Sequence, residues 1–155
     1  MLTIRPMQDS DLSAVLEIER RSYPHPWKRD HFLHELSAPH SFPFVAFDES
    51  GAVVGYLCLM SLFEEAQVLN LAVAPEQRGR GVGRLLMERA VELAREKGAG
   101  YLALEVRSSN VAAIGLYESF GFIRCGLRPC YYEGVEDAVL MEKPLQGANG
   151  CSLPQ

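Results

Sequence analysis

Three features of the sequence place reactive residue types where a folded chain could use them. Arg78-Gly-Arg-Gly-Val-Gly83 lies between a predicted strand and a predicted helix, where glycines let backbone amides approach an anion. Glu105 interrupts an apolar run near the carboxyl end of another predicted strand, where open α/β sheets bind ligands. Asn110 and Tyr117 stand seven residues apart, which puts both on one face of a helix. Together these features predict an anion site beside groups that can transfer protons.

The glycine loop matches neither of two common phosphate-binding patterns. It lacks the Gly-Lys-Ser/Thr ending of the Walker loop and the G-x-G-x-x-G spacing of dinucleotide-binding folds. Residues 78–107 contain seven basic and four acidic side chains, a net charge of +3, so the total of −5 leaves −8 on the rest of the chain. This asymmetry predicts a polyanionic ligand on the basic stretch and a cationic one elsewhere. The alternative interpretation of the loop is an ordinary glycine-rich turn.

Each candidate reactive side chain also has a structural interpretation. Glu105 can act as a general base, or it can form a structural ion pair with Arg107 or another arginine. The Tyr117 phenol is protonated at neutral pH and can donate a proton, or its ring can pack in the core. Asn110 can contact a ligand and cap the following helix at the same time.

Apolar periodicity and turn residues predict seven strands and four helices in the order β-α-α-β-β-β-α-β-α-β-β. The predicted strands cover residues 2–5, 44–48, 52–60, 66–73, 101–106, 122–128 and 138–142. The predicted helices carry Leu12 to Ile18, Phe32 to Leu36, Val82 to Lys97 and Val111 to Phe120. Adjacent strands require antiparallel pairing and the strand-helix-strand segments require a parallel crossover. We therefore expect an α/β (α+β) fold with a mixed, mostly antiparallel sheet and helices on both faces.

Length and composition bound the remaining possibilities. The chain has 155 residues, 48% hydrophobic and 23% charged, which is typical of one domain; we assign it to residues 1–145, with a flexible tail over 146–155. No leader or membrane-spanning run is evident, which predicts a cytoplasmic protein. The four cysteines and four histidines lack metal-ligand spacing, which predicts free thiols and no metal. The net charge of −5 argues against direct nucleic-acid binding.

The segment Val73-Ala-Pro-Glu-Gln-Arg-Gly-Arg-Gly-Val-Gly83 resembles the signature loop of the GNAT superfamily of acetyl-coenzyme A dependent N-acetyltransferases, Arg/Gln-x-x-Gly-x-Gly/Ala. The resemblance implies acetyl-coenzyme A as co-substrate. Its pyrophosphate would lie on the loop formed by Arg78, Gly79, Arg80, Gly81, Val82 and Gly83. Its pantetheine arm would contact Asn110 and the strand residues Leu71, Ala72 and Val73, one of whose amides would stabilise the oxyanion. Tyr117 would protonate the leaving thiolate.

Residues 104–122 are similar to the corresponding segment of the bacterial ribosomal-protein-alanine N-acetyltransferases (RimI type), as are Pro26-Trp27 and Tyr131-Tyr132. This resemblance implies that Glu105 is the general base and that the acceptor is the N-terminal alanine of a basic ribosomal protein. Trp27, Tyr131 and Tyr132 are the candidate substrate-binding residues. No cysteine has a catalytic histidine pattern, so we expect direct transfer without an acetyl-enzyme. The alternatives are acetylation of a lysine or small amine, and a non-catalytic module that binds acetyl-coenzyme A.

Overall fold

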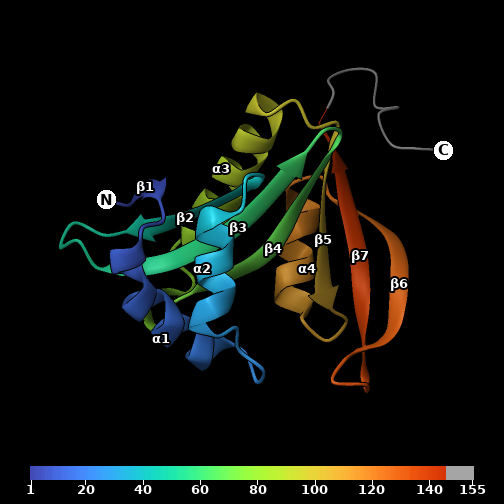
Figure 1. Cartoon of the computed structure of the whole chain (residues 1–155). Helices are drawn as coiled ribbons and strands as arrows, with labels where there is room; N and C mark the ends of the chain where they lie inside the picture. Colours follow the sequence, from blue (N-terminus) through green and yellow to red (C-terminus); the bar gives the residue numbers. More distant parts are fainter. Residues whose placement is uncertain (146–155) are drawn as a thin grey trace.

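Seven strands form one mixed sheet in the computed structural model, which describes residues 1–145 (Figure 1). The strands are β1 (Thr3–Pro6), β2 (Ser41–Phe47), β3 (Val53–Leu62), β4 (Glu65–Val73), β5 (Tyr101–Arg107), β6 (Ile123–Tyr132) and β7 (Glu136–Pro144). Their order across the sheet is β1-β2-β3-β4-β5-β7-β6, and only β4 and β5 pair in parallel. The predicted fold class and strand number are confirmed, and the predicted tail over 146–155 lies outside the described residues.

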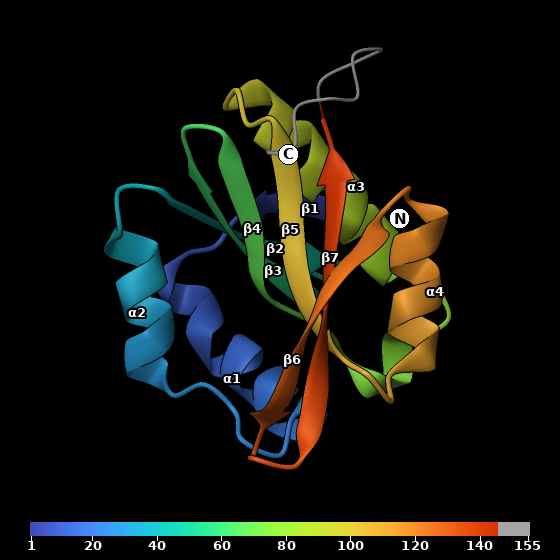
Figure 2. The same ribbon diagram turned by 90° about the vertical axis from the view of Figure 1, so that its right-hand side faces the viewer.

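Helices cover both faces of the sheet, with α1 and α2 on one side and α3 and α4 on the other (Figure 2). They are α1 (Leu12–Ser22), α2 (Arg29–Ser37), α3 (Val82–Glu96) and α4 (Val111–Ser119), with short 3-10 turns η1 (Asp9–Asp11) and η2 (Pro75–Gln77). Apolar residues at helical spacing form the buried faces, so each pair of helices closes its own hydrophobic core against the sheet. None of the helices formed by residues 1–145 is long and apolar enough to cross a membrane.

Two irregularities in the sheet open it where a ligand could enter. Parallel pairing of β4 with β5 covers only Glu65–Gln67 against Tyr101–Ala103, and the strands then diverge toward their carboxyl ends (Figure 1). In β4, Leu69 is an extra residue between Val68, which pairs with Leu59, and Asn70, which pairs with Cys58. Such a bulge bends its strand. The divergence and the bulge together leave a gap in the sheet.

Several predicted element boundaries need correction. The strand predicted over 44–48 spans Ser41–Phe47, and the one predicted over 52–60 continues to Leu62. The last two strands are longer than predicted, because β6 continues past residue 128 to Tyr132 and β7 covers Glu136–Pro144. Tyr131 and Tyr132 therefore end a strand, whereas the sequence predicted a loop. The pairing of β6 with β7 is irregular between Arg128 and Tyr132. The sequence there accordingly lacks the alternation of residue types that marks a strand.

Candidate active site

A cleft of about 450 Å³ occupies the gap between the diverging strands β4 and β5. Its walls come from α1 and the loop after it, α2, β4, β5, α4, the end of β6, and the turn that joins β6 to β7. The lining residues are Glu19, Tyr23, His25, Trp27, Glu35, Gln67, Val68, Leu69, Asn70, Leu71, Leu104, Glu105, Val106, Arg107, Asn110, Tyr117, Tyr131, Tyr132 and Glu133. The lining contains four carboxylates and one guanidinium, so the cleft is acidic.

The fold brings seven of the fifteen predicted site residues together in this cleft. Glu105, Tyr117, Asn110, Leu71, Trp27, Tyr131 and Tyr132 all line it. Ala72, Val73 and the loop Arg78–Gly83 do not line it, and they continue from the end of β4 beside it. A carbon added at Gly83 would lie 3.8 Å from Val73 and 3.7 Å from Leu116 of α4, so the loop leads into a helix packed against both β4 and α4. The predicted anion loop thus adjoins the wall that carries Tyr117.

Glu105 lies in the cleft wall with its side chain 18% exposed. Its Oε2 is 3.0 Å from Nη2 of Arg128 on β6, so the predicted alternative of an ion pair with an arginine is met by Arg128 and not by Arg107. The guanidinium of Arg128 also lies 4.6 Å from the centre of the Tyr131 ring. No residue between 1 and 145 donates a hydrogen bond to the other carboxylate oxygen of Glu105, which leaves that oxygen for a ligand.

Tyr117 reaches the cleft from the buried side of α4. Its burial, together with the nearby Tyr132, raises the pKa of Tyr117 to about 12, so the phenol keeps its proton at neutral pH. The ring packs against Phe122 with 5.9 Å between ring centres, which also satisfies the predicted core role. The hydroxyl makes no hydrogen bond to any residue in the described part of the chain. A donor that lines the cleft and has no protein partner is available to a ligand. Asn110 caps α4, as predicted, by accepting a hydrogen bond from the Ala113 amide at 3.2 Å.

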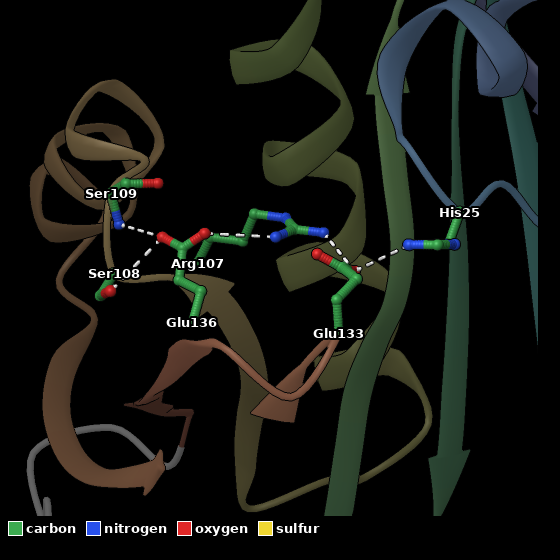
Figure 3. A network of polar contacts seen from close by, with 6 residues as sticks. All are labelled: His25, Arg107, Ser108, Ser109, Glu133 and Glu136. Carbon is green, nitrogen blue, oxygen red and sulfur yellow. Dashed lines mark hydrogen bonds and ion pairs between the residues drawn. The ribbon is translucent and has the colours of Figure 1, made fainter. Parts of the chain in front are cut away.

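A charged network joins the two sides of the cleft mouth (Figure 3). Arg107 at the end of β5 donates to Glu133 at 2.7 Å and to Glu136 at 3.2 Å. Hydrogen bonds from Arg107 and from Ser109, respectively, lower the pKa values of Glu133 and Glu136. Nε2 of His25, from the loop between α1 and α2, lies 4.0 Å from Glu133. The network fixes the β6–β7 turn beside Tyr132, whose ring lies 4.4 Å below the Arg107 guanidinium.

The loop before α3 has the geometry that an anion requires. Gly79 and Gly81 adopt left-handed φ values of 80° and 83°, and Gly81 is the N-cap of α3. The first bond of the helix joins the Leu85 amide to the Gly81 carbonyl at 3.0 Å, so the amides of the first turn have no acceptor within the helix. Arg78 donates to the Val73 carbonyl at 3.2 Å and so ties the loop to β4, whereas Arg80 has no ion-pair partner between residues 1 and 145. Free amides and a free guanidinium fit a pyrophosphate.

Tyr23 and Glu19 are among the cleft residues that escaped sequence analysis. Tyr23 donates a hydrogen bond to the Leu71 carbonyl just after the bulge in β4, and burial raises the pKa of Tyr23, so it remains a donor. Glu19 is 1% exposed and accepts hydrogen bonds from three elements. A signal in the sequence could have identified Glu19, because it falls on the face of α1 that carries Leu12 and Val15. A carboxylate on an apolar face indicates a buried polar role.

The comparisons with known proteins agree with this geometry. The sequence model of the Acetyltransferase (GNAT) family matches residues 12–122. The ribosomal protein bS18-alanine N-acetyltransferase of Escherichia coli K12 is 34% identical over 148 residues, 94% of this chain and 99% of that protein. The N-alpha-acetyltransferase RimI of Mycobacterium tuberculosis is 36% identical over 137 residues, 84% of each chain. The crystal structure of the Escherichia coli ribosomal-protein-S18-alanine N-acetyltransferase covers 96% of each chain with a TM-score of 0.88. These matches confirm the resemblance first indicated by the loop at 73–83, and the chain belongs to the acetyltransferase (GNAT) family.

Proposed function

We propose that the protein transfers the acetyl group of acetyl-coenzyme A directly to the N-terminal α-amine of a protein, with the N-terminal alanine of a small-subunit ribosomal protein as acceptor. The observation that carries the proposal is that Glu105 and Tyr117, a carboxylate and a protonated phenol, line one acidic cleft beside an anion loop. The names of the relatives from Escherichia coli and Mycobacterium tuberculosis support the same acceptor class. An acceptor among ribosomal proteins implies action in the cytoplasm.

Different residues would bind the coenzyme and carry out the two proton transfers. Acetyl-coenzyme A, held by the amides of the loop at 78–83 and by the cations Arg78 and Arg80, supplies the thioester carbonyl that the amine attacks. Glu105 would accept the proton that the amine loses, and Tyr117 would donate its proton to the departing sulfur. An α-amine suits such a base, because its pKa near 7.7–8.0 leaves about a tenth of it neutral at pH 7, whereas a lysine amine is almost wholly charged.

The acidic cleft and the positions of the cysteines support two further parts of the proposal. Four carboxylates in the lining favour a positively charged peptide, such as a basic protein N-terminus. No cysteine of residues 1–145 lines the cleft, and burial raises the pKa of the Cys58 thiol on β3. A covalent acetyl-cysteine would therefore form away from Glu105 and Tyr117, which supports direct transfer.

A peptide panel tests the acceptor. Each peptide starts with alanine and continues with arginines, and matched peptides carry a blocked N-terminus with an internal lysine, or glutamates in place of the arginines. We expect mass spectrometry to locate the acetyl group on the free α-amine, and we expect kcat/KM to fall at least about tenfold when glutamates replace the arginines. Acetylation of the lysine in blocked peptides at a similar rate would contradict the proposed acceptor class. Acetyl-coenzyme A binding with no transfer to any amine would contradict the enzymatic proposal.

A further inference from the structure

Glu19 is a buried carboxylate that connects three parts of the cleft wall. It lies on α1 with 1% of its surface exposed, and it forms no ion pair with any residue between 1 and 145. Oε1 accepts hydrogen bonds from the Tyr56 hydroxyl on β3 and from Nδ2 of Asn70 on β4, at 2.8 Å for the latter. Oε2 accepts from the Trp27 amide at 2.9 Å. A buried carboxylate is costly unless its oxygens accept hydrogen bonds, so these donors must keep their orientation.

The hydrogen bond from Asn70 fixes which way its amide group faces. An asparagine amide has a donor side and an acceptor side, and the partner determines their assignment. The Glu19 oxygen accepts from Nδ2, so Oδ1 of Asn70 must face away from Glu19. No residue of the described chain donates to this Oδ1. Oδ1 is not fully enclosed either, because the only buried side-chain oxygen or nitrogen without a partner between 1 and 145 is Oγ of Ser61. Asn70 lines the cleft, so its free acceptor is open to a ligand there.

We propose that Oδ1 of Asn70 accepts a hydrogen bond from the amine that is to be acetylated, and that Glu19 is the positioning residue that orients it. This inference rests on the proposed function. A neutral primary amine has two N–H groups, one for Glu105 and one for Asn70, and its lone pair is then free for the attack. A neutral amide oxygen orients the amine and stabilises its charged, unreactive form less than another carboxylate would.

The proposal predicts discrimination between primary and secondary amines. A peptide that starts with N-methylalanine has only one N–H in its neutral form, so it can satisfy Glu105 or Asn70 but not both. The wild-type protein should therefore prefer alanine over N-methylalanine. Asn70→Ala should remove the part of this preference that comes from the second hydrogen bond, whereas a general loss of stability would lower both rates and leave their ratio unchanged.

The experiment measures kcat/KM for the alanine and N-methylalanine peptides in the full-length protein. For Asn70→Ala we expect a loss of about tenfold with the alanine peptide and a loss of about twofold or less with the N-methyl peptide, while the KM for acetyl-coenzyme A stays within about twofold. Glu19→Gln should shift the ratio in the same direction, because a glutamine amide lets Asn70 flip. The double variant should lose little more than Asn70→Ala alone.

Two control variants separate positioning from stability. Glu17→Gln lies on the exposed side of the same helix, where Glu17 pairs only with Arg20, and it should leave the ratio unchanged. Tyr56→Phe removes a donor to the same carboxylate, yet Tyr56 does not line the cleft, so it should lower the melting temperature and change the ratio less than Asn70→Ala does. An unchanged ratio in Asn70→Ala would overturn the inference alone. A wild-type protein that acetylates no α-amine would overturn the proposed function and the inference with it.

Discussion

At the scale of single residues, Glu105 has to serve two partners. Its Oε2 is bound to Arg128, whose side chain is 53% exposed, and its other oxygen faces the cleft. An exposed ion pair contributes at most about 1 kcal/mol, so the stability of the fold does not depend on this contact. A general base, in contrast, contributes about a hundredfold to ten-thousandfold in rate. The two roles therefore differ in the size of the effect that they predict.

The matched variants Glu105→Gln and Arg128→Gln separate these roles. Glu105→Gln should lower kcat at least about a hundredfold and leave the affinity for acetyl-coenzyme A within about twofold, because glutamine cannot accept the amine proton. Arg128→Gln removes only the ion pair and should lower kcat by less than about tenfold. Steady-state kinetics and calorimetric titration with acetyl-coenzyme A measure both quantities. Equal losses of kcat in the two variants would show that the ion pair, and not proton transfer to Glu105, is required for activity.

The local sequence was enough to single out residues that line the cleft, although it does not test their chemical roles. Glu105 was identifiable because it breaks an apolar strand, and Asn110 because it precedes a helix with capping geometry. Arg128 was not identifiable as the partner of Glu105, because the pairing depends on β7 entering the sheet between β5 and β6. The role of Glu19 depends on donors from β3, β4 and the loop after α1, which no local pattern connects.

At the scale of elements, α3 begins and ends with glycines of the same backbone geometry. Gly81 before the helix has φ of 83° and Gly98 after it has φ of 84°, and a Cβ at either position would meet no atom within 4 Å. Replacing either by alanine therefore costs about 1–2 kcal/mol through backbone strain and not through collision. Only Gly81 adjoins the amides that are expected to bind the coenzyme.

This pair gives a controlled test of the anion loop. Gly81→Ala and Gly98→Ala should lower the urea unfolding midpoint by similar amounts. Gly81→Ala alone should raise the KM for acetyl-coenzyme A about tenfold or more, because relief of the strain turns the first-turn amides away from the pyrophosphate. The KM for the acceptor peptide should change little in both. A rise in the coenzyme KM for Gly98→Ala of the same size would mean that global stability, and not the loop, controls binding.

Element-level prediction was good for the helices and incomplete for the sheet. Capping residues and glycines marked both ends of α3 and the start of α4. The bulge at Leu69 and the separation of β4 from β5 were not predicted, although they create the cleft. The run from Ala66 to Val73 contains no glycine or proline that would mark a bulge. Both irregularities arise from pairing between distant strands, so tertiary structure decides them.

At the scale of the whole molecule, the net charges of the two parts of the sequence do not by themselves locate the ligand sites. Within the basic stretch, Arg89 pairs with Glu96 at 3.2 Å and Arg107 is held by Glu133 and Glu136. Arg95 and Lys97 lie at the far end of α3, so the arginines around the glycine loop are the ones placed for a coenzyme. Three carboxylates of the acidic remainder, Glu19, Glu35 and Glu133, line the cleft together with Glu105 of the basic stretch. Position, and not net charge, therefore determines where each ligand can bind.

Phenols in and behind the cleft wall give the whole fold a dependence on alkaline pH. Burial raises the pKa values of Tyr117 and Tyr132 to about 12 and those of Tyr23 and Tyr56 further, whereas an unfolded tyrosine titrates near 10. The folded state thus keeps protons that the unfolded state loses, so stability is complete below about pH 10 and falls as the pH rises toward 12. For Tyr117 the shift corresponds to about 3 kcal/mol, a large part of the 5–15 kcal/mol typical of a domain.

We therefore expect the urea unfolding midpoint to be nearly constant between about pH 7 and pH 9 and to fall steeply above about pH 10. The part of the tyrosinate absorbance that Tyr117→Phe removes should rise together with unfolding, because this phenol ionises only when the chain opens. Over the alkaline range, the free energy of unfolding should fall by about 3 kcal/mol less in Tyr117→Phe than in the wild-type protein, because the variant lacks this ionisable phenol. An unchanged slope in Tyr117→Phe, or a wild-type minus Tyr117→Phe absorbance difference that rises well before unfolding, would show that Tyr117 ionises freely in the folded protein. It could not then be the protonated donor that faces the departing sulfur.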